Sequence, residues 1–136
     1  MVPVNGSHAS LQAVAVACDV ARKNKAKLYV VHVIEVKRTL PLDAQLEQES
    51  AAGEDVLSQA GRVAREQDCD MEGEILQARE AGPAIVDEAI ERGVDLIVLG
   101  MAYRQPFGEF QLGRIVQYVL KSAPCEVWVC RHPVQE

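Results

Sequence analysis

Two glycine-containing segments are the parts of this sequence best suited to bind a ligand, and both would do so through backbone N–H groups. One is the turn Asn5-Gly6-Ser7, and the other extends from Gly100 to Gly113. Glycine turns after strands and glycines at helix starts expose N–H groups that can bind an anion. If the fold brings the two segments together, they predict an anion site.

Groups for covalent, acid–base or metal chemistry do not form a recognisable motif. The sequence contains no G-x-S-x-G, no P-loop lysine motif and no His/Cys/Asp cluster at metal-ligand spacing. The acidic side chains Glu47, Glu49, Glu54 and Asp55 are expected to form a solvated helix face. His32 lies in an apolar run and is expected to be a hydrogen-bonded core residue. We therefore predict no enzymatic activity and no bound metal.

Composition restricts the class of protein. The 136 residues are enough for one hydrophobic core, so we expect a single domain over residues 1–136. A net charge of −6 argues against nucleic-acid binding, and no apolar run approaches the roughly 18 residues of a membrane span. No signal peptide is recognisable at the start. The cysteines Cys18, Cys69, Cys125 and Cys130 lie in apolar contexts, which indicates reduced thiols and a cytoplasmic location.

Hydrophobic periodicity predicts five strands that alternate with four helices. The expected strands cover residues 1–4, 27–35, 69–77, 96–99 and 126–130, and the helices start near Ser7, Ala44, Pro83 and Gly113. The alternation predicts an α/β fold with a parallel sheet and helices on both of its faces. Ligands of such sheets bind beyond the carboxyl ends of the strands. If the first and fourth strands are neighbours, the two glycine segments face each other there.

The first strand is short, because only four residues precede the turn that starts at Asn5. Strands usually have about five or six residues. Two interpretations therefore stay open: the chain is a piece of a longer protein, or it begins with a short strand.

Four stretches, in this order and spacing, resemble the universal stress protein family. They read V-P-V-N-G-S at 2–7, L-Y-V-V-H-V-I-E at 28–35, V-D-L-I-V-L-G at 94–100 and G-R-I-V-Q-Y-V-L-K-S-A-P-C-E-V-W-V at 113–129. The resemblance implies a Rossmann-like open sheet of five parallel strands in the order 3-2-1-4-5. It also implies homodimers formed through the last strand, from Glu126 to Arg131, and a regulatory or stress-response role without catalysis.

Some members of this family bind ATP through a glycine pattern that this sequence keeps only in part. The pattern is Gly, two residues, Gly, nine residues, Gly and then Ser or Thr. Gly100 and Gly113 match its first and third glycines, but Tyr103 takes the place of the second and Arg114 that of the hydroxyl residue. A tyrosine ring there would occupy phosphate space, or would cost about 1–2 kcal/mol if the position needs a positive φ.

The resemblance also implies which residues lie around the adenine. Pro3 and Val33 match positions that line the adenine pocket, and Ile115 matches the residue after the hydroxyl. Asn5 replaces the aspartate that ATP-binding members use near the adenine. Its carbonyl oxygen can still accept a hydrogen bond from an amino group, but without a charge.

Arg114 stands in the first turn of a predicted helix, where a cation opposes the helix dipole. Three interpretations of this side chain stay open. It is solvated, it pairs with Glu109, or it binds an anion together with Arg104.

Three functions fit these observations. The first is a dimeric regulatory or stress-response domain whose adenine-nucleotide binding is weak or lost. The second is a switch that binds ATP or another adenine nucleotide through Gly100, Gly113 and nearby arginines. The third is a cytosolic regulatory domain of a membrane transporter, which accords with a piece of a longer protein. A regulatory role implies a protein partner, which the sequence does not identify.

Overall fold

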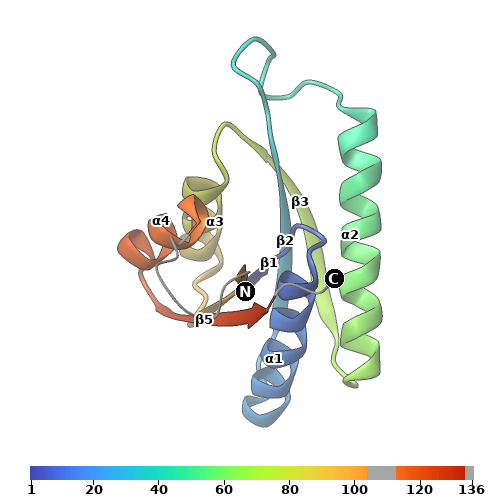
Figure 1. Cartoon of the computed structure of the whole chain (residues 1–136), viewed down its shortest axis with the longest axis vertical. Helices are drawn as coiled ribbons and strands as arrows, with labels where there is room; N and C mark the ends of the chain where they lie inside the picture. Colours follow the sequence, from blue (N-terminus) through green and yellow to red (C-terminus); the bar gives the residue numbers. More distant parts are fainter. Residues whose placement is uncertain (104–112, 134–136) are drawn as a thin grey trace.

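The computed structural model of the chain describes residues 1–103 and 113–133, in which strands alternate with helices (Figure 1). The elements are β1 (Val2–Pro3), α1 (His8–Asn24), β2 (Leu28–Glu35), α2 (Glu47–Glu66), β3 (Met71–Ala78), α3 (Ala81–Arg92), β4 (Leu96–Tyr103), α4 (Arg114–Ser122) and β5 (Glu126–Pro133). The predicted alternation is therefore confirmed, although α2 begins at Glu47 rather than near Ala44.

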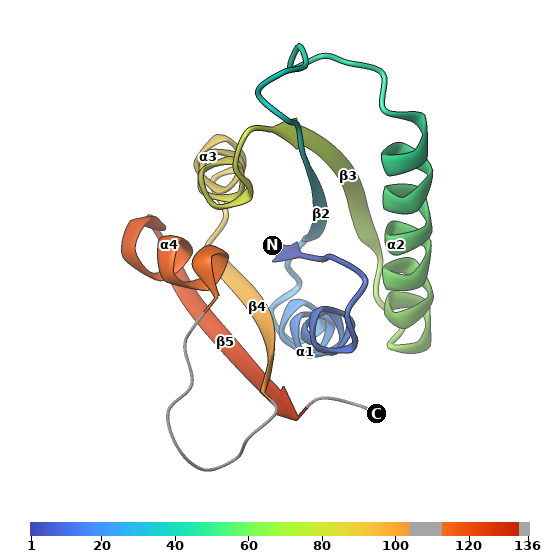
Figure 2. The same cartoon turned by 45° about the horizontal axis from the view of Figure 1, so that its top comes forward.

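The strands run parallel and form a sheet in the order β3-β2-β1-β4-β5. β1, β2 and β3 share one hydrogen-bonded ladder, and β4 and β5 share another. Met1 joins the ladders, because its nitrogen donates to the Leu96 oxygen (2.7 Å) and its oxygen accepts from the Val98 nitrogen (3.0 Å). In parallel strands one residue bonds in this way to two residues of the neighbouring strand that lie two positions apart. The predicted order is confirmed, and Figure 2 shows the β4–β5 pair turned relative to β2 and β3.

Helices cover both faces of the sheet, with α1 and α2 on one face and α3 and α4 on the other (Figure 1). Each face has its own hydrophobic core. Buried side chains include Val14, Cys18, Val30 and Val98 on the α1–α2 side, and Val31, Ile85, Ile97 and Val119 on the α3–α4 side. Val30 and Val31 belong to opposite cores, as neighbouring residues of a strand covered on both faces must. Within the described ranges, no helix combines the length and the apolar composition needed to cross a bilayer.

Local sequence signals set the ends of the helices. Ser7 caps α1, because its hydroxyl oxygen accepts from the Ser10 N–H at 3.2 Å. Gly93 ends α3 with a φ of +61°, a conformation that glycine adopts without strain. His32, in the middle of β2, is hydrogen-bonded as predicted, since its Nδ1 lies 2.9 Å from the Val4 oxygen.

β4 does not end at Gly100, where the sequence pattern predicted a turn. It continues to Tyr103, and Gly100 pairs with Cys130 of β5. The glycine serves packing instead, because a β-carbon at this position would lie 2.1 Å from the Ala9 oxygen of α1. The backbone of α1 thus packs directly on β4. A hydrophobicity pattern cannot reveal this contact, because it depends on where a distant helix lies.

Candidate functional site

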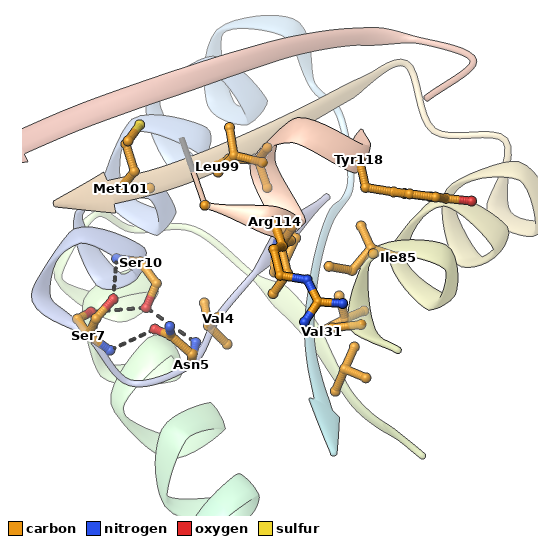
Figure 3. Close-up of a pocket in the computed structure, with 18 of the residues that line it drawn as sticks. Val4, Asn5, Ser7, Ser10, Val31, Ile85, Leu99, Met101, Arg114 and Tyr118 are labelled. Carbon is orange, nitrogen blue, oxygen red and sulfur yellow. Dashed lines mark hydrogen bonds between the residues drawn. The ribbon is translucent and has the colours of Figure 1, made fainter. Parts of the chain in front are cut away.

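A cavity of about 720 Å³ lies at the carboxyl ends of the central strands (Figure 3). Its walls come from the ends of β1, β2 and β4, from the turn after β1, and from the first turns of α3 and α4. Val31, Ile85 and Leu99 contribute apolar side chains to these walls. Open parallel sheets bind their ligands at this place, where the strand order reverses.

Most of the residues singled out from the sequence lie around this one cavity. They are Pro3, Asn5, Val33, Gly100, Gly113, Arg114 and Ile115. The two glycine segments therefore meet at a common opening, although they are far apart in the sequence. Tyr103 is not among the described residues that line the cavity. Its ring instead lies against the guanidinium of Arg131, with the Cζ atom 3.6 Å from the ring centroid.

The turn after β1 fixes Asn5 at the rim of the cavity. The Asn5 side-chain oxygen Oδ1 accepts from the Ser7 N–H at 3.0 Å, and the Asn5 N–H donates to Ser10 Oγ at 3.4 Å. Ser10 Oγ in turn donates to the Ser7 backbone oxygen at 2.9 Å. Gly6 supplies the positive φ, +88°, that this turn requires. Figure 3 shows these bonds as a connected group beside the cavity.

Two carboxylates, Glu35 and Glu80, also line the cavity, and the sequence pattern did not mark them. Glu35 ends β2 and accepts from the Ala81 N–H of α3 at 2.9 Å through Oε2. The residue at the N-cap position of α3, Glu80, makes no capping bond. The sequence feature that could have pointed to Glu35 is an acidic residue at the end of a buried-strand pattern. Its partner lies 46 positions away, so the sequence could not have shown the bond.

The helix starts around the cavity differ in how their first N–H groups are satisfied. Ser7 caps α1, and Glu35 accepts from the first N–H of α3. α4 has Gly113 at its N-cap position, and no side chain of the described residues caps it. An uncapped helix start carries partial positive charge and attracts anions. The start of α4 therefore gives this end of the cavity partial positive charge.

Arg114, the first residue of α4, adds a full positive charge at this end. Its exposed side chain lies among the other lining side chains (Figure 3). No hydrogen bond or ion pair joins it to another residue of the described ranges. The two residues considered with it from the sequence, Arg104 and Glu109, lie outside the described residues. A β-carbon at Gly113 would meet no atom of the described residues within 4 Å.

The cysteines do not contribute a reactive group to the cavity. All four are free thiols, and none of them lines the cavity. Burial, together with a hydrogen bond involving Cys69, raises the pKa of the Cys18 thiol to about 12. Burial also raises the pKa of Cys125 and of Cys130. Thiols with a raised pKa are poor nucleophiles, because the thiolate is the reactive form.

The sequence profile of the universal stress protein family matches residues 1–131 of this chain. The chain belongs to the universal stress protein family. A universal stress protein of Methanocaldococcus jannaschii is 28% identical to it over 142 residues, which cover 100% of this chain and 83% of the relative.

Solved structures of other family members share the fold of this universal stress protein. The protein from Archaeoglobus fulgidus in complex with dAMP has a TM-score of 0.75 at 22% identity, covering 93% of this chain and 92% of that chain. A family member from Arabidopsis thaliana with AMP bound has a TM-score of 0.71 at 20% identity, covering 97% of this chain and 90% of that chain. At these identities, the likeness establishes the Rossmann-like fold.

Proposed function

We propose that this universal stress protein is a regulatory, non-catalytic domain whose cavity binds a nucleoside monophosphate, with ATP binding weak or lost. The supporting observation is the position of Arg114, in the same cavity as Asn5 and at the start of α4, which no described side chain caps. A guanidinium beside the N–H groups of a helix start suits one phosphate group. The related proteins of A. fulgidus and A. thaliana hold dAMP and AMP, each of which carries one phosphate.

The charges around the cavity favour one phosphate over three. Among the lining residues of the described ranges, Arg114 supplies the positive charge, whereas Glu35 and Glu80 supply two negative charges. Like charges close together repel one another. The second and third phosphates of ATP would add negative charge that no described lining residue neutralises. The absence of a Ser or Thr at position 114 removes a further hydroxyl donor.

Isothermal titration with AMP, IMP, GMP and ATP tests this proposal. We expect a monophosphate to bind with a Kd on the order of 10 µM, and ATP to bind about tenfold more weakly. Arg114→Gln should weaken monophosphate binding about tenfold, because it removes a charge-assisted phosphate contact. Lys121→Gln removes a cation from the last turn of the same helix and should leave the affinity unchanged. Binding of ATP as tight as that of the monophosphates, or no binding of any nucleotide, would refute the proposal.

We also propose that two copies pair through β5. In the described chain β5 is the last strand of the sheet order, with β4 as its ladder partner. An edge strand leaves N–H and C=O groups unpaired, and pairing Glu126–Arg131 of two copies would satisfy them across a two-fold axis. Trp128 on this strand is 39% exposed and would add apolar contact area.

The four free thiols suit the reducing cytoplasm, where we place the protein.

Sedimentation equilibrium tests the homodimer. We expect a dimer for the natural sequence at micromolar concentration, and a shift toward monomer for Trp128→Glu, because the substitution places two like charges near the axis. The control is Ile90→Glu on α3, where the side chain is 59% exposed and far from β5 in sequence. A monomeric natural protein, or equal dissociation in both variants, would count against pairing through β5.

A further inference from the structure

The side chain of Asn5 bears on which base the cavity accepts. We propose that the cavity prefers a nucleotide whose base carries a carbonyl oxygen where adenine carries its amino group, as hypoxanthine and guanine do. This preference presupposes the proposed function, because it requires a nucleotide in the cavity. It makes Asn5 the residue that determines base specificity.

The hydrogen bonds of the turn fix which end of the Asn5 amide is available to a ligand. The backbone N–H of Ser7 is a donor, so the amide group that meets it at 3.0 Å must be the oxygen Oδ1. Figure 3 shows this oxygen directed at Ser7. The amino group Nδ2 has no hydrogen-bond partner in the described ranges, and Asn5 is exposed to the cavity. Asn5 therefore offers a ligand a hydrogen-bond donor.

The apolar part of the cavity places a base next to this donor. Asn5 follows β1 directly, and β1 pairs with β2 so that Pro3 lies opposite Val31. Pro3, Val31 and Val33 all line the cavity and form an apolar surface next to Asn5. A flat purine ring is stabilised by covering such a surface, which leaves its polar edge to meet Asn5. The phosphate is then attracted to Arg114 and the start of α4.

The chemistry of the base edge decides the preference. The exocyclic amino group of adenine donates hydrogen bonds, and so does Nδ2 of Asn5, so the two groups cannot pair. A buried donor without an acceptor loses its water contacts and gains nothing in return. The carbonyl oxygen at C6 of hypoxanthine or guanine accepts from Nδ2 instead. An aspartate at position 5 would reverse the preference, because its second oxygen only accepts.

Inosine and adenosine monophosphates are matched probes, since they differ only at C6 and in the protonation of N1. In isothermal titration we expect IMP to bind about tenfold more tightly than AMP. GMP and the monophosphate of 2,6-diaminopurine riboside repeat this comparison with a second pair, and GMP should bind more tightly. Asn5→Asp keeps an acceptor for the Ser7 N–H, so the turn persists, and AMP should then bind more tightly than IMP.

The outcomes separate this inference from the proposed function. Equal affinities within both pairs, or tighter binding of the amino bases, would overturn the base preference while nucleotide binding itself stands. An unchanged preference in Asn5→Asp would show that Asn5 is not its cause. No binding by any of the four nucleotides would overturn the proposed function as well. If thermal melting shows that Asn5→Asp does not fold, the two ligand pairs measured on the natural sequence still decide the preference.

Discussion

Gly100 of β4 and Ala9 of α1 are in direct backbone contact. A β-carbon at position 100 would lie 2.1 Å from the Ala9 oxygen and 2.5 Å from its carbonyl carbon. No real β-carbon approaches a carbonyl oxygen that closely, so any other residue would push α1 away from the sheet. The contact holds the first turn of α1, and with it the turn that contains Asn5, against the strand that borders the cavity.

Gly100→Ala should therefore destabilise the protein by about 1–3 kcal/mol, because the backbone of α1 has to move. Chemical denaturation measures the change in the free energy of unfolding. Gly113→Ala is the matched control, since Gly113 has a negative φ and no described residue would lie within 4 Å of an added β-carbon. It should cost less than Gly100→Ala, about 0.5 kcal/mol, because alanine is only a poorer N-cap residue than glycine. Equal effects at the two positions would show that the contact with Ala9 is relaxed in solution.

Gly113→Asp should stabilise the protein slightly and abolish nucleotide binding. Aspartate is a better N-cap residue than glycine, so α4 should gain a few tenths of a kcal/mol. The same carboxylate would occupy and neutralise the helix start at which we expect the phosphate. Thermal melting with and without a monophosphate measures both effects together. Gly113→Ala should keep the ligand-induced shift, and persistence of the shift in Gly113→Asp would exclude phosphate binding at this helix start.

Tyr103→Gly should not improve nucleotide binding. The sequence placed this ring in the phosphate space, but it lies against the Arg131 guanidinium and does not line the cavity in the described chain. Restoring a glycine should thus change the ATP affinity by less than about twofold, a difference below 0.5 kcal/mol. Isothermal titration with ATP is the measurement. A gain of tenfold or more would mean that the tyrosine does obstruct phosphate binding.

Glu35→Ala should destabilise α3, although Glu35 itself lies on β2. The Glu35 carboxylate accepts the Ala81 N–H at 2.9 Å, and losing such a cap costs about 0.5–1 kcal/mol at an exposed site. Glu80→Ala removes the carboxylate at the N-cap position itself, which makes no capping bond, and should cost less. The denaturation midpoints of Glu35→Ala and Glu80→Ala show which of the two carboxylates caps α3. A larger loss in Glu80→Ala would contradict the cap assigned to Glu35.

Stability should fall in alkaline solution through Cys18. Its pKa is raised from 9.0 to about 12, because the thiol is buried and is hydrogen-bonded with Cys69. Between these two pH values the unfolded chain loses the proton and the folded chain keeps it, so deprotonation favours unfolding as the pH rises. The stability advantage of the natural sequence over Cys18→Ala should therefore shrink from pH 9 upward. Denaturation at several pH values measures it, and a constant difference would argue against a raised pKa.

The alternation of strands and helices, and with it the parallel α/β fold, follows from the amino-acid sequence alone. These features are encoded locally, in the period of apolar residues, in the cap at Ser7 and in the terminating glycine at Gly93. Together with the family resemblance, the sequence also pointed to residues that line the cavity, such as Pro3, Asn5 and Arg114, but it did not mark Glu35 or Glu80.

The roles of several residues depend instead on contacts that form when the chain folds. Gly100 makes room for α1, Tyr103 packs on Arg131, and Glu35 caps a helix that begins 46 residues later. Each of these roles depends on a contact between segments far apart in the chain. Such contacts are fixed by how helices pack on the sheet, which no local pattern of residue types records.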